Sequence, residues 1–293
     1  MEFVEQMKRK QEEINAILSR YLPEEKGEER LLFEAMNYSV RVGGKRIRPM
    51  LLLEAYKMFG GTGAGADSFA VALELIHTYS LVHDDLPAMD NDMYRRGNLT
   101  THAKYGHAMG VLAGDGLLNY AFEVMSDAVV AGSIPEAKAM AIIAKKAGVT
   151  GMIAGQVVDV MNTGTPLSKE LLDYINERKT SALICAALMA GAALARATEE
   201  DLRMLEKVGI YVGLAFQIKD DILDVTGDET KLGKPVHSDE KNEKNTYVTL
   251  IGIEKAEETV RIYSEKAVEL LDALPYRNGF LKQLLISLVT REY

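Results

Sequence analysis

The sequence predicts an all-α protein, and three observations support that fold class. Apolar residues recur at the three- and four-residue spacing of a helix along most of the chain, whereas the alternation typical of a strand is scarce. Glycine and proline interrupt this pattern at intervals that suit helix ends. No repeat, low-complexity tract or linker-like change in composition divides the 293 residues. We therefore expect a single domain, residues 1–293, built as a bundle of about ten helices around a central cavity.

Helix-breaking residues set the expected boundaries. Pro49 fits the first turn of the third helix, a turn is expected at Gly97-Asn98, and Pro135 begins another helix. The GTP stretch at 164–166 ends a helix, and the polar, charged stretch 228–245 is expected to be a loop. The expected helices cover residues 3–21, 31–42, 49–60, 68–90, 105–130, 135–161, 167–197, 200–224, 246–274 and 279–289.

Composition narrows the class of protein. Apolar residues make up 47% and charged residues 26%, as in soluble globular proteins, and the net charge of −9 argues against nucleic-acid binding, which needs a basic surface. Cys185 is the only cysteine, so an internal disulfide is excluded and a reducing compartment fits. The N-terminus lacks a signal-peptide core, and no window offers about 20 uninterrupted apolar residues. We expect a cytoplasmic protein with no membrane span.

The stretch 75–97, LIHTYSLVHDDLPAMDNDMYRRG, is the most informative part of the chain. An apolar segment leads into four aspartates and two arginines: Asp84, Asp85, Asp90, Asp92, Arg95 and Arg96. Crowded carboxylates repel one another at the end of an apolar segment, so a cation must compensate. Mg²⁺ prefers oxygen ligands and often bridges carboxylates to phosphates, while guanidinium groups bind phosphate through paired hydrogen bonds. This stretch predicts a metal–diphosphate site at the end of a buried helix.

A second acidic cluster follows another long apolar helix. The stretch FQIKDDILD places Asp220, Asp221 and Asp224 at its end, with Asp220 and Asp224 on one helix face. A lone DDxxD pattern is weak evidence, because acidic helix ends are common and mostly solvated. Two such clusters favour a shared metal site. If they face each other across a cavity, metals held between them could bind a diphosphate.

Several basic and polar residues are candidates for binding that diphosphate. The stretch GGKRIRP, 43–49, sets three cations beside a glycine pair whose backbone N–H groups can bind an anion, although a solvated surface turn fits as well. Lys179 precedes a strongly apolar helix, and a buried lysine needs an anion or an acid. His77 lies two helical turns before Asp84, where a core histidine is the alternative. The further candidates are Lys45, Arg48, Thr180, Gln217, Lys234 and Lys244.

The three motifs HDDLPAMDNDMYRRG, FQIKDDILD and GGKRIRP on an all-helical chain resemble those of the trans-prenyltransferases, and more narrowly the bacterial short-chain farnesyl diphosphate synthases. The resemblance covers essentially the whole chain and implies the isoprenoid synthase type of fold and a homodimer. It implies that isopentenyl diphosphate is joined head to tail to dimethylallyl diphosphate and then to geranyl diphosphate, giving farnesyl diphosphate and pyrophosphate. One departure is Met93-Tyr94, where family members commonly have an acid and a leucine. It affects only the edge of the motif.

The resemblance also implies a role for each matching residue. Six aspartates would bind Mg²⁺, about three ions per active site: Asp84, Asp85, Asp90, Asp220, Asp221 and Asp224. The strongest direct ligands would be Asp84, Asp90 and Asp220. Isopentenyl diphosphate would be held by Lys45, Arg48, His77 and Arg96. The allylic diphosphate would be held by Arg95, Lys179, Lys234 and Lys244. The residues beside the reacting allylic carbons, catalytic together with Lys179, would be Thr180 and Gln217, with Gln156 supporting the site from the GQVVD segment.

Tyr79 and Ser80 are expected to set product length. On a helix that ends at Asp84 they lie just over one turn below the metals, where a growing chain would descend. In the resembling family an aromatic residue here, with the extra Pro87-Ala88 pair in the motif, accompanies the farnesyl product. The nearest alternative is a geranylgeranyl diphosphate synthase. A terpene cyclase should lack the second aspartate motif and GGKRIRP, and a regulatory subunit should have lost aspartates.

Overall fold

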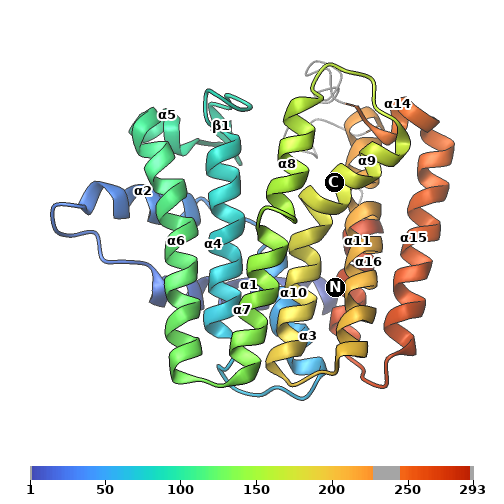
Figure 1. Cartoon of the computed structure of the whole chain (residues 1–293), viewed down its shortest axis with the longest axis horizontal. Coiled ribbons are helices and arrows are strands. Elements are labelled where there is room, and N and C mark those ends of the chain that lie inside the picture. The colour runs from blue at the N-terminus through green and yellow to red at the C-terminus, as the bar shows by residue number, and fades with distance from the viewer. Residues whose placement is uncertain (1, 227–244, 291–293) are drawn as a thin grey trace.

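The computed structural model describes residues 2–226 and 245–290. Within these residues the chain is almost entirely helical, as expected, with one short hairpin (Figure 1). The elements are α1 (Glu2–Tyr21), α2 (Arg30–Arg41), α3 (Ile47–Met58), α4 (Asp67–Asp84), β1 (Tyr94–Arg95), β2 (Asn98–Leu99), α5 (Thr101–Tyr105), α6 (His107–Ala131), α7 (Ile134–Ala147), α8 (Met152–Met161), α9 (Lys169–Asn176), the π-helical turn η1 (Glu177–Ser181), α10 (Ala182–Leu194), α11 (Glu199–Thr226), α14 (Tyr247–Ile251), α15 (Ile253–Ala273) and α16 (Gly279–Thr290).

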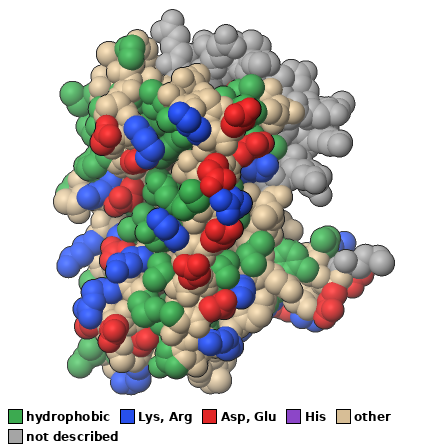
Figure 2. All heavy atoms as spheres, turned by 90° about the vertical axis from the view of Figure 1, so that its right-hand side faces the viewer, with side chains coloured by type: hydrophobic (Ala, Val, Ile, Leu, Met, Phe, Trp, Pro, Cys, Tyr) green, Lys and Arg blue, Asp and Glu red, His purple; other side chains and the backbone are tan. Residues whose placement is uncertain are grey.

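The core lies around α4 and α10, whose side chains are buried on nearly all sides. A helix that is apolar all round must be covered all round. Accordingly, α10 contacts α3, α7 and α11, while α4 packs against α3 and α6. A smaller apolar cluster joins α9, α11, α14 and α15. On the face that carries α15, acidic and basic side chains are interspersed with apolar ones (Figure 2).

Several helix boundaries differ from the expectation, and each difference has a local cause. The helix expected over 68–90 ends at Asp84, because Pro87 cannot continue a helix and the following residues form turns. The helix expected over 105–130 begins at His107, because Gly106, whose φ is +91°, separates it from the short helix α5. The helix expected over 135–161 is divided into α7 and α8 at residues 148–151. The helix expected over 167–197 contains the π turn η1 between α9 and α10.

The turn expected at Gly97-Asn98 is the tip of the β1–β2 hairpin. Tyr94 pairs with Leu99 and Arg95 with Asn98. The two residues of the turn, Arg96 and Gly97, have φ of +54° and +76°. Positive φ at both central positions is the geometry that joins two twisted strands by two residues.

Both helices that carry aspartate motifs end on the same side of the bundle. In Figure 1 the C-terminal ends of α4 and α11 point upward, and the β1–β2 hairpin lies at that end. The sequence places the two motifs far apart, so only the antiparallel course of the intervening helices brings them to one end. Lys234 and Lys244 lie outside the described residues.

One helical stretch among the described residues, Ile134–Met161, is long and apolar enough to cross a membrane by length and composition. This stretch, and not the segment around Cys185, satisfies that criterion. A single stretch of this kind is weak evidence for a membrane span, since buried core helices also satisfy the criterion.

Candidate active site

The loop after α4 folds back on itself and brings two aspartates of the first motif together. Asp84 is the last residue of α4, and the Asp90 backbone N–H donates a hydrogen bond to the Asp84 carbonyl oxygen at 2.9 Å. Asp90 is exposed and Asp84 is half-buried. These two aspartates are six residues apart in the sequence, and a backbone turn, not a continuing helix, brings them together.

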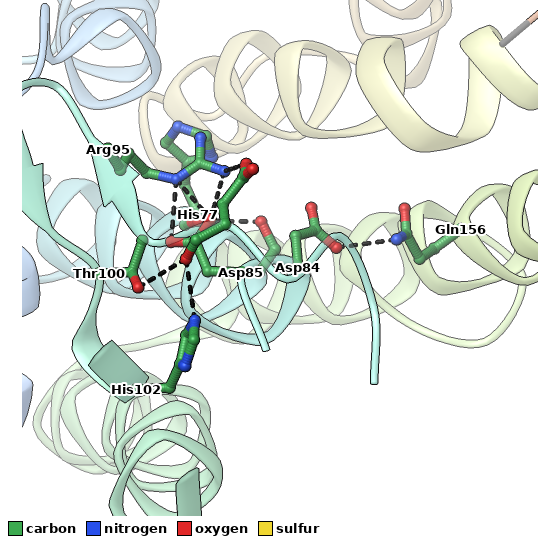
Figure 3. Close-up of polar contacts among 9 residues, drawn as sticks. His77, Asp84, Asp85, Arg95, Thr100, His102 and Gln156 are labelled. Carbon is green, nitrogen blue, oxygen red and sulfur yellow. Dashed lines mark hydrogen bonds and ion pairs between the residues drawn. The ribbon is translucent and has the colours of Figure 1, made fainter. Parts of the chain in front are cut away.

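Asp84 is held from a second helix. The amide Nε2 of Gln156, in α8, donates a hydrogen bond to Asp84 Oδ1 at 2.8 Å (Figure 3). Burial is the main cause that raises the pKa of Asp84 to about 6, and the charges of Asp90 and Asp85 add to it, while Lys179 and Arg95 oppose it. A carboxylate in this environment gains stability from a bound cation.

The Asp85 carboxylate forms an ion pair with Arg95 of the hairpin. Arg95 Nε donates to Asp85 Oδ1 and Oδ2 at 2.8 and 3.0 Å, and Nη2 donates to Oδ1 at 2.5 Å (Figure 3). Asp85 is only 3% exposed. The base of the hairpin is fixed further because Thr100 Oγ1 and His102 Nε2 both donate to the Asp92 carbonyl oxygen, at 2.7 and 2.8 Å. The first motif therefore positions the hairpin and the arginines that it carries.

The second motif is tied to the chain on both sides. Gln217 Nε2 donates to Asp221 Oδ1 at 3.2 Å, and the backbone N–H of Tyr247 donates to Asp221 Oδ2 at 2.8 Å. Asp221 and Asp224 are buried, whereas Asp220 is half-buried. Asp221 thus anchors the start of α14 against the end of α11.

The π turn η1 lies between the two motifs. Lys179 Nζ forms an ion pair with Asp159 Oδ2 of α8 at 2.6 Å, and Thr180 Oγ1 donates to Gln217 Oε1 of α11 at 3.2 Å. Although burial opposes its charge, the carboxylates of Asp159, Asp84 and Asp90 outweigh that cost and raise the pKa of Lys179. Polar contacts on α8, η1 and α11 therefore connect the surroundings of Asp84 to those of Asp221.

Two glycines allow α8 and α11 to approach the π turn this closely. A Cβ atom at Gly155 of α8 would lie 2.3 Å from the Lys179 backbone nitrogen, and one at Gly213 of α11 would lie 2.3 Å from Ser181 Oγ. Both distances are far below van der Waals contact, so a side chain at either position would separate the helices. π-helical turns of this kind occur frequently at functional sites.

A pocket beside the hairpin is lined by cationic and polar groups. It lies between α2, α4 and the hairpin, and its lining includes Glu74, His77, Asp85, Arg95 and Arg96. Arg48 Nη1 donates to His77 Nε2 at 3.1 Å, while Arg48 Nε is buried without a hydrogen-bond partner in the described structure. Burial and then the neighbouring arginines hold the pKa of His77 well below its usual range, so His77 is neutral and accepts. Guanidinium groups beside a neutral histidine, one of them with an unbonded buried donor, suit an anionic ligand.

The donor set of the two motifs fits Mg²⁺. Among the described residues, no three or more His, Cys, Asp or Glu side chains already converge on one metal position. This agrees with the coordination of Mg²⁺, which usually takes one or two carboxylates and completes its shell with water and substrate phosphates. The all-oxygen ligands of both motifs match that preference.

The residues predicted to set product length lie close below this end of α4. Tyr79 is 7% exposed within the main core, and its ring meets that of His83 edge to face at 5.7 Å. Burial, and then the charge of Asp84, raise the pKa of Tyr79 to about 12. Ser80 is half-buried and donates to the His77 carbonyl oxygen at 2.9 Å.

Three residues of the site, Asp159, Arg46 and Glu74, were not predicted from the sequence. Asp159 was detectable, because it lies three residues after Gln156 and therefore on the same face of a helix. Arg46 was counted among the cations of GGKRIRP, but its inward direction cannot be read from the sequence. Lys45 is exposed beside it.

An all-helical bundle with acidic and basic side chains gathered at one end has the isoprenoid synthase type of fold. The chain belongs to the polyprenyl synthetase family, whose sequence model matches residues 29–273. It is 44% identical over 268 residues to a farnesyl diphosphate synthase of Geobacillus stearothermophilus, covering 90% of each chain. It is 40% identical over 264 residues to a geranylgeranyl diphosphate synthase of Cyanophora paradoxa, covering 89% of this chain and 87% of the relative.

A solved structure agrees with the fold over almost the full length. The geranyltransferase of Helicobacter pylori, complexed with magnesium and isoprenyl diphosphate, superposes with a TM-score of 0.85 at 34% identity. The match covers 99% of this chain and 97% of that protein. The predicted fold class and family are therefore confirmed.

The raised pKa of Asp84 predicts a pH dependence of stability. Because its pKa rises from 3.8 to about 6 on folding, the native state holds the proton more tightly between these values, and stability falls as the pH rises through this window. Without divalent cations, D84N should therefore gain stability relative to the wild type between pH 4 and 6. Urea unfolding at several pH values measures the difference, with D92N as the control. Parallel curves for wild type and D84N would contradict the assignment.

Proposed function

We propose that this protein is a farnesyl diphosphate synthase, which condenses isopentenyl diphosphate with dimethylallyl diphosphate and then with geranyl diphosphate. The observation that carries the proposal is the polar connection between the two aspartate motifs through Gln156, Lys179, Thr180 and Gln217. It links carboxylates of both motifs to a lysine beside an apolar core. We further propose that residues 1–293 act as one domain and that the protein functions in the cytoplasm.

In this proposal Asp84, Asp90 and Asp220 hold Mg²⁺, about three ions in all, because their side chains are exposed or half-buried. When bound, Mg²⁺ supplies positive charge that stabilises the departing pyrophosphate. Asp85, Asp221 and Asp224 are buried and support the site. Asp85 does so by fixing Arg95, and Asp221 by holding Gln217 and Tyr247.

The chain's own cations bind the two diphosphates in different places. Lys179, with Arg95 and the predicted contributions of Lys234 and Lys244, holds the allylic diphosphate. His77 and Arg96, which line the pocket beside the hairpin, hold isopentenyl diphosphate together with Lys45 and with Arg48, which is bonded to His77. Neutral His77 accepts from Arg48 and so directs the guanidinium without adding a positive charge.

The reaction requires that an allylic cation be kept from water and faced with partial negative charge. The apolar helices α4 and α10 exclude water from the interior. The Gln217 amide oxygen, oriented by the Thr180 hydroxyl, and the backbone carbonyls of the π turn provide negative dipoles. The double bond of isopentenyl diphosphate then attacks the cation, and the departed pyrophosphate accepts the proton that is lost.

Replacing Tyr79 with alanine should lengthen the product. Tyr79 is buried just below Asp84, so its removal opens space where the growing chain would descend. We expect geranylgeranyl diphosphate to replace part of the farnesyl diphosphate when the products are separated by chromatography after dephosphorylation. Y56A, which changes an aromatic residue near the loop that precedes α4, should leave the product unchanged. An unchanged product profile for Y79A would refute this assignment of the cavity floor.

Product identification with each allylic starter tests the proposed function. Purified protein with Mg²⁺, isopentenyl diphosphate and either dimethylallyl or geranyl diphosphate should release pyrophosphate and yield farnesyl diphosphate. Geranylgeranyl diphosphate as the main wild-type product would favour the alternative within the same family, to which the 40% identical relative of Cyanophora paradoxa belongs. Absence of pyrophosphate release with both starters would refute the proposal.

We also propose that the protein is a homodimer. Three apolar residues at helical spacing on α8, namely Ile153, Val157 and Val160, are 37%, 49% and 49% exposed, and a second copy would cover them. Light scattering should therefore give twice the chain mass of 32.3 kDa. A monomeric mass at micromolar concentration would contradict this proposal.

A further inference from the structure

A buried ion pair adjoins the pocket beside the hairpin, which we call the basic pocket because Arg95 and Arg96 line it. The pair takes no direct part in the proposed chemistry. We propose that the pair Arg46–Glu74 is a positioning device that sets the GGKRIRP segment for isopentenyl diphosphate, and that this site depends on it selectively. The inference rests on the proposed function and deepens it. It concerns residues that contact neither substrate nor metal in that proposal.

Arg46 joins four helices from a single position. Its side chain is 4% exposed, and its Nη1 donates to Glu74 Oε1 of α4 at 2.7 Å. Nη2 donates to the Val40 carbonyl oxygen of α2 at 2.6 Å, and Nε donates to Asn15 Oδ1 of α1 at 2.9 Å. Its own carbonyl oxygen accepts from the Met50 N–H and so begins α3. The three acceptors are reached from three different nitrogens of the planar guanidinium, whereas an ammonium group has all its donors on one nitrogen.

The backbone of Arg46 is in the left-handed region, with φ of +53° and ψ of +36°. This conformation is unfavourable for a residue with a side chain, so the contacts of the guanidinium must offset it. With this backbone conformation the Arg46 side chain is buried, the Lys45 side chain is exposed, and Arg48 contacts His77. The directions of the two predicted ligands, Lys45 and Arg48, therefore depend on how Arg46 is held.

The same segment also contacts the hairpin. A Cβ atom at Gly44 would lie 2.5 Å from Arg96 Nη1, so the Arg96 guanidinium is placed against the backbone of Gly44. The Gly44 carbonyl oxygen in turn accepts from Gln11 Nε2 of α1 at 2.6 Å. Any shift of the segment would therefore displace Arg96 as well as Lys45 and Arg48.

Glu74 supplies the negative charge for this group of cations. It lies one turn before His77 on α4 and lines the basic pocket. Burial lowers the pKa of Arg48 to about 10, and the charge of Glu74 opposes that effect at both Arg48 and Arg96. The charge of Glu74 thus stabilises the cations of the pocket before a diphosphate binds. Because Glu74 is hydrogen-bonded to Arg46, the guanidinium groups of Arg48 and Arg96 stay available to bind the diphosphate.

The decisive variant is the double substitution R46M/E74M. It removes both charges of the pair together, so the net charge is unchanged and neither member of the pair is left buried alone, and such replacements often leave stability unchanged. We expect the KM for isopentenyl diphosphate to rise about tenfold, with the KM for geranyl diphosphate within about twofold and kcat within about threefold. Calorimetric titration with isopentenyl diphosphate should show the same loss of affinity.

Two further variants keep the test decisive. R46K retains the charge but cannot reach all three acceptors, so it should give the same selective rise in KM, about threefold, even if the double variant does not fold. The control K10M/E54M removes another buried ion pair, between α1 and α3, with Nζ–Oε1 at 2.6 Å. It should leave both KM values unchanged.

Equal changes in both KM values, or no change in either, would overturn the inference and leave the pair with a purely structural role. Wild-type protein that neither binds isopentenyl diphosphate nor releases pyrophosphate would instead refute the proposed function, and the inference with it. The two failures are therefore distinguished by the wild-type measurement alone.

Discussion

Replacing Asp84 with asparagine is expected to lower kcat by about three orders of magnitude, which corresponds to about 4 kcal/mol of transition-state stabilisation. Asparagine keeps the shape of the side chain and an oxygen that can accept from Gln156, so the fold around α4 should persist. It lacks the charge that would hold a cation beside the departing pyrophosphate, and a charge interaction in a site shielded from water is worth far more than in solution.

The measurement is pyrophosphate release at saturating substrates over a range of Mg²⁺ concentrations. D84N should also need more Mg²⁺ for half-maximal activity. The control is D92N, which changes an exposed carboxylate in the same loop whose Oδ2 lies 3.8 Å from Arg95 Nη2. We expect D92N to retain activity within about tenfold of the wild type, because an exposed ion pair contributes little. A loss below tenfold for D84N would exclude Asp84 as a direct metal ligand.

The second large effect on activity is expected when Lys179 is replaced by glutamine (K179Q). Lys179 belongs to the π turn, whose polar contacts connect the surroundings of the two aspartate motifs, and it is paired with Asp159 of α8 and close to the charges of Asp84 and Asp90. Glutamine retains a donor for Asp159 but removes the positive charge. We expect kcat/KM for geranyl diphosphate to fall about a hundredfold, or about 3 kcal/mol, with a smaller effect on the KM for isopentenyl diphosphate.

D159N is the matched variant for this experiment. It keeps the lysine charge and removes only the carboxylate that directs it, so it should lower kcat/KM by about tenfold. Circular dichroism of both variants should match that of the wild type. Equal losses for K179Q and D159N would show that the ion pair matters as a unit and that Lys179 does not bind the diphosphate by itself.

The amphipathic and apolar periodicities predicted the helices well, because burial acts at every turn of a helix. Boundaries that depend on a single residue, such as the start of α3 near Pro49, were also predictable. The end of α4 was predicted wrongly at Asp90. Pro87 and the hydrogen bond from the Asp90 backbone N–H to the Asp84 carbonyl oxygen form a loop there instead. The π turn had no signal in the periodicity, because α10, which follows it, is apolar on nearly all sides and has no single face that would reveal a shift.

What the sequence determined by itself is the helical fold class, the two aspartate motifs and the basic segment that define the family. These features are encoded in neighbouring residues, where spacing and residue type suffice. What only the tertiary structure decided is the partner of each charged group. Asp85 binds Arg95, Asp221 binds the Tyr247 N–H, and Arg46 turns inward to Glu74. The reason is physical: a buried charge must find its partner in space, and those partners come from helices far apart in the chain.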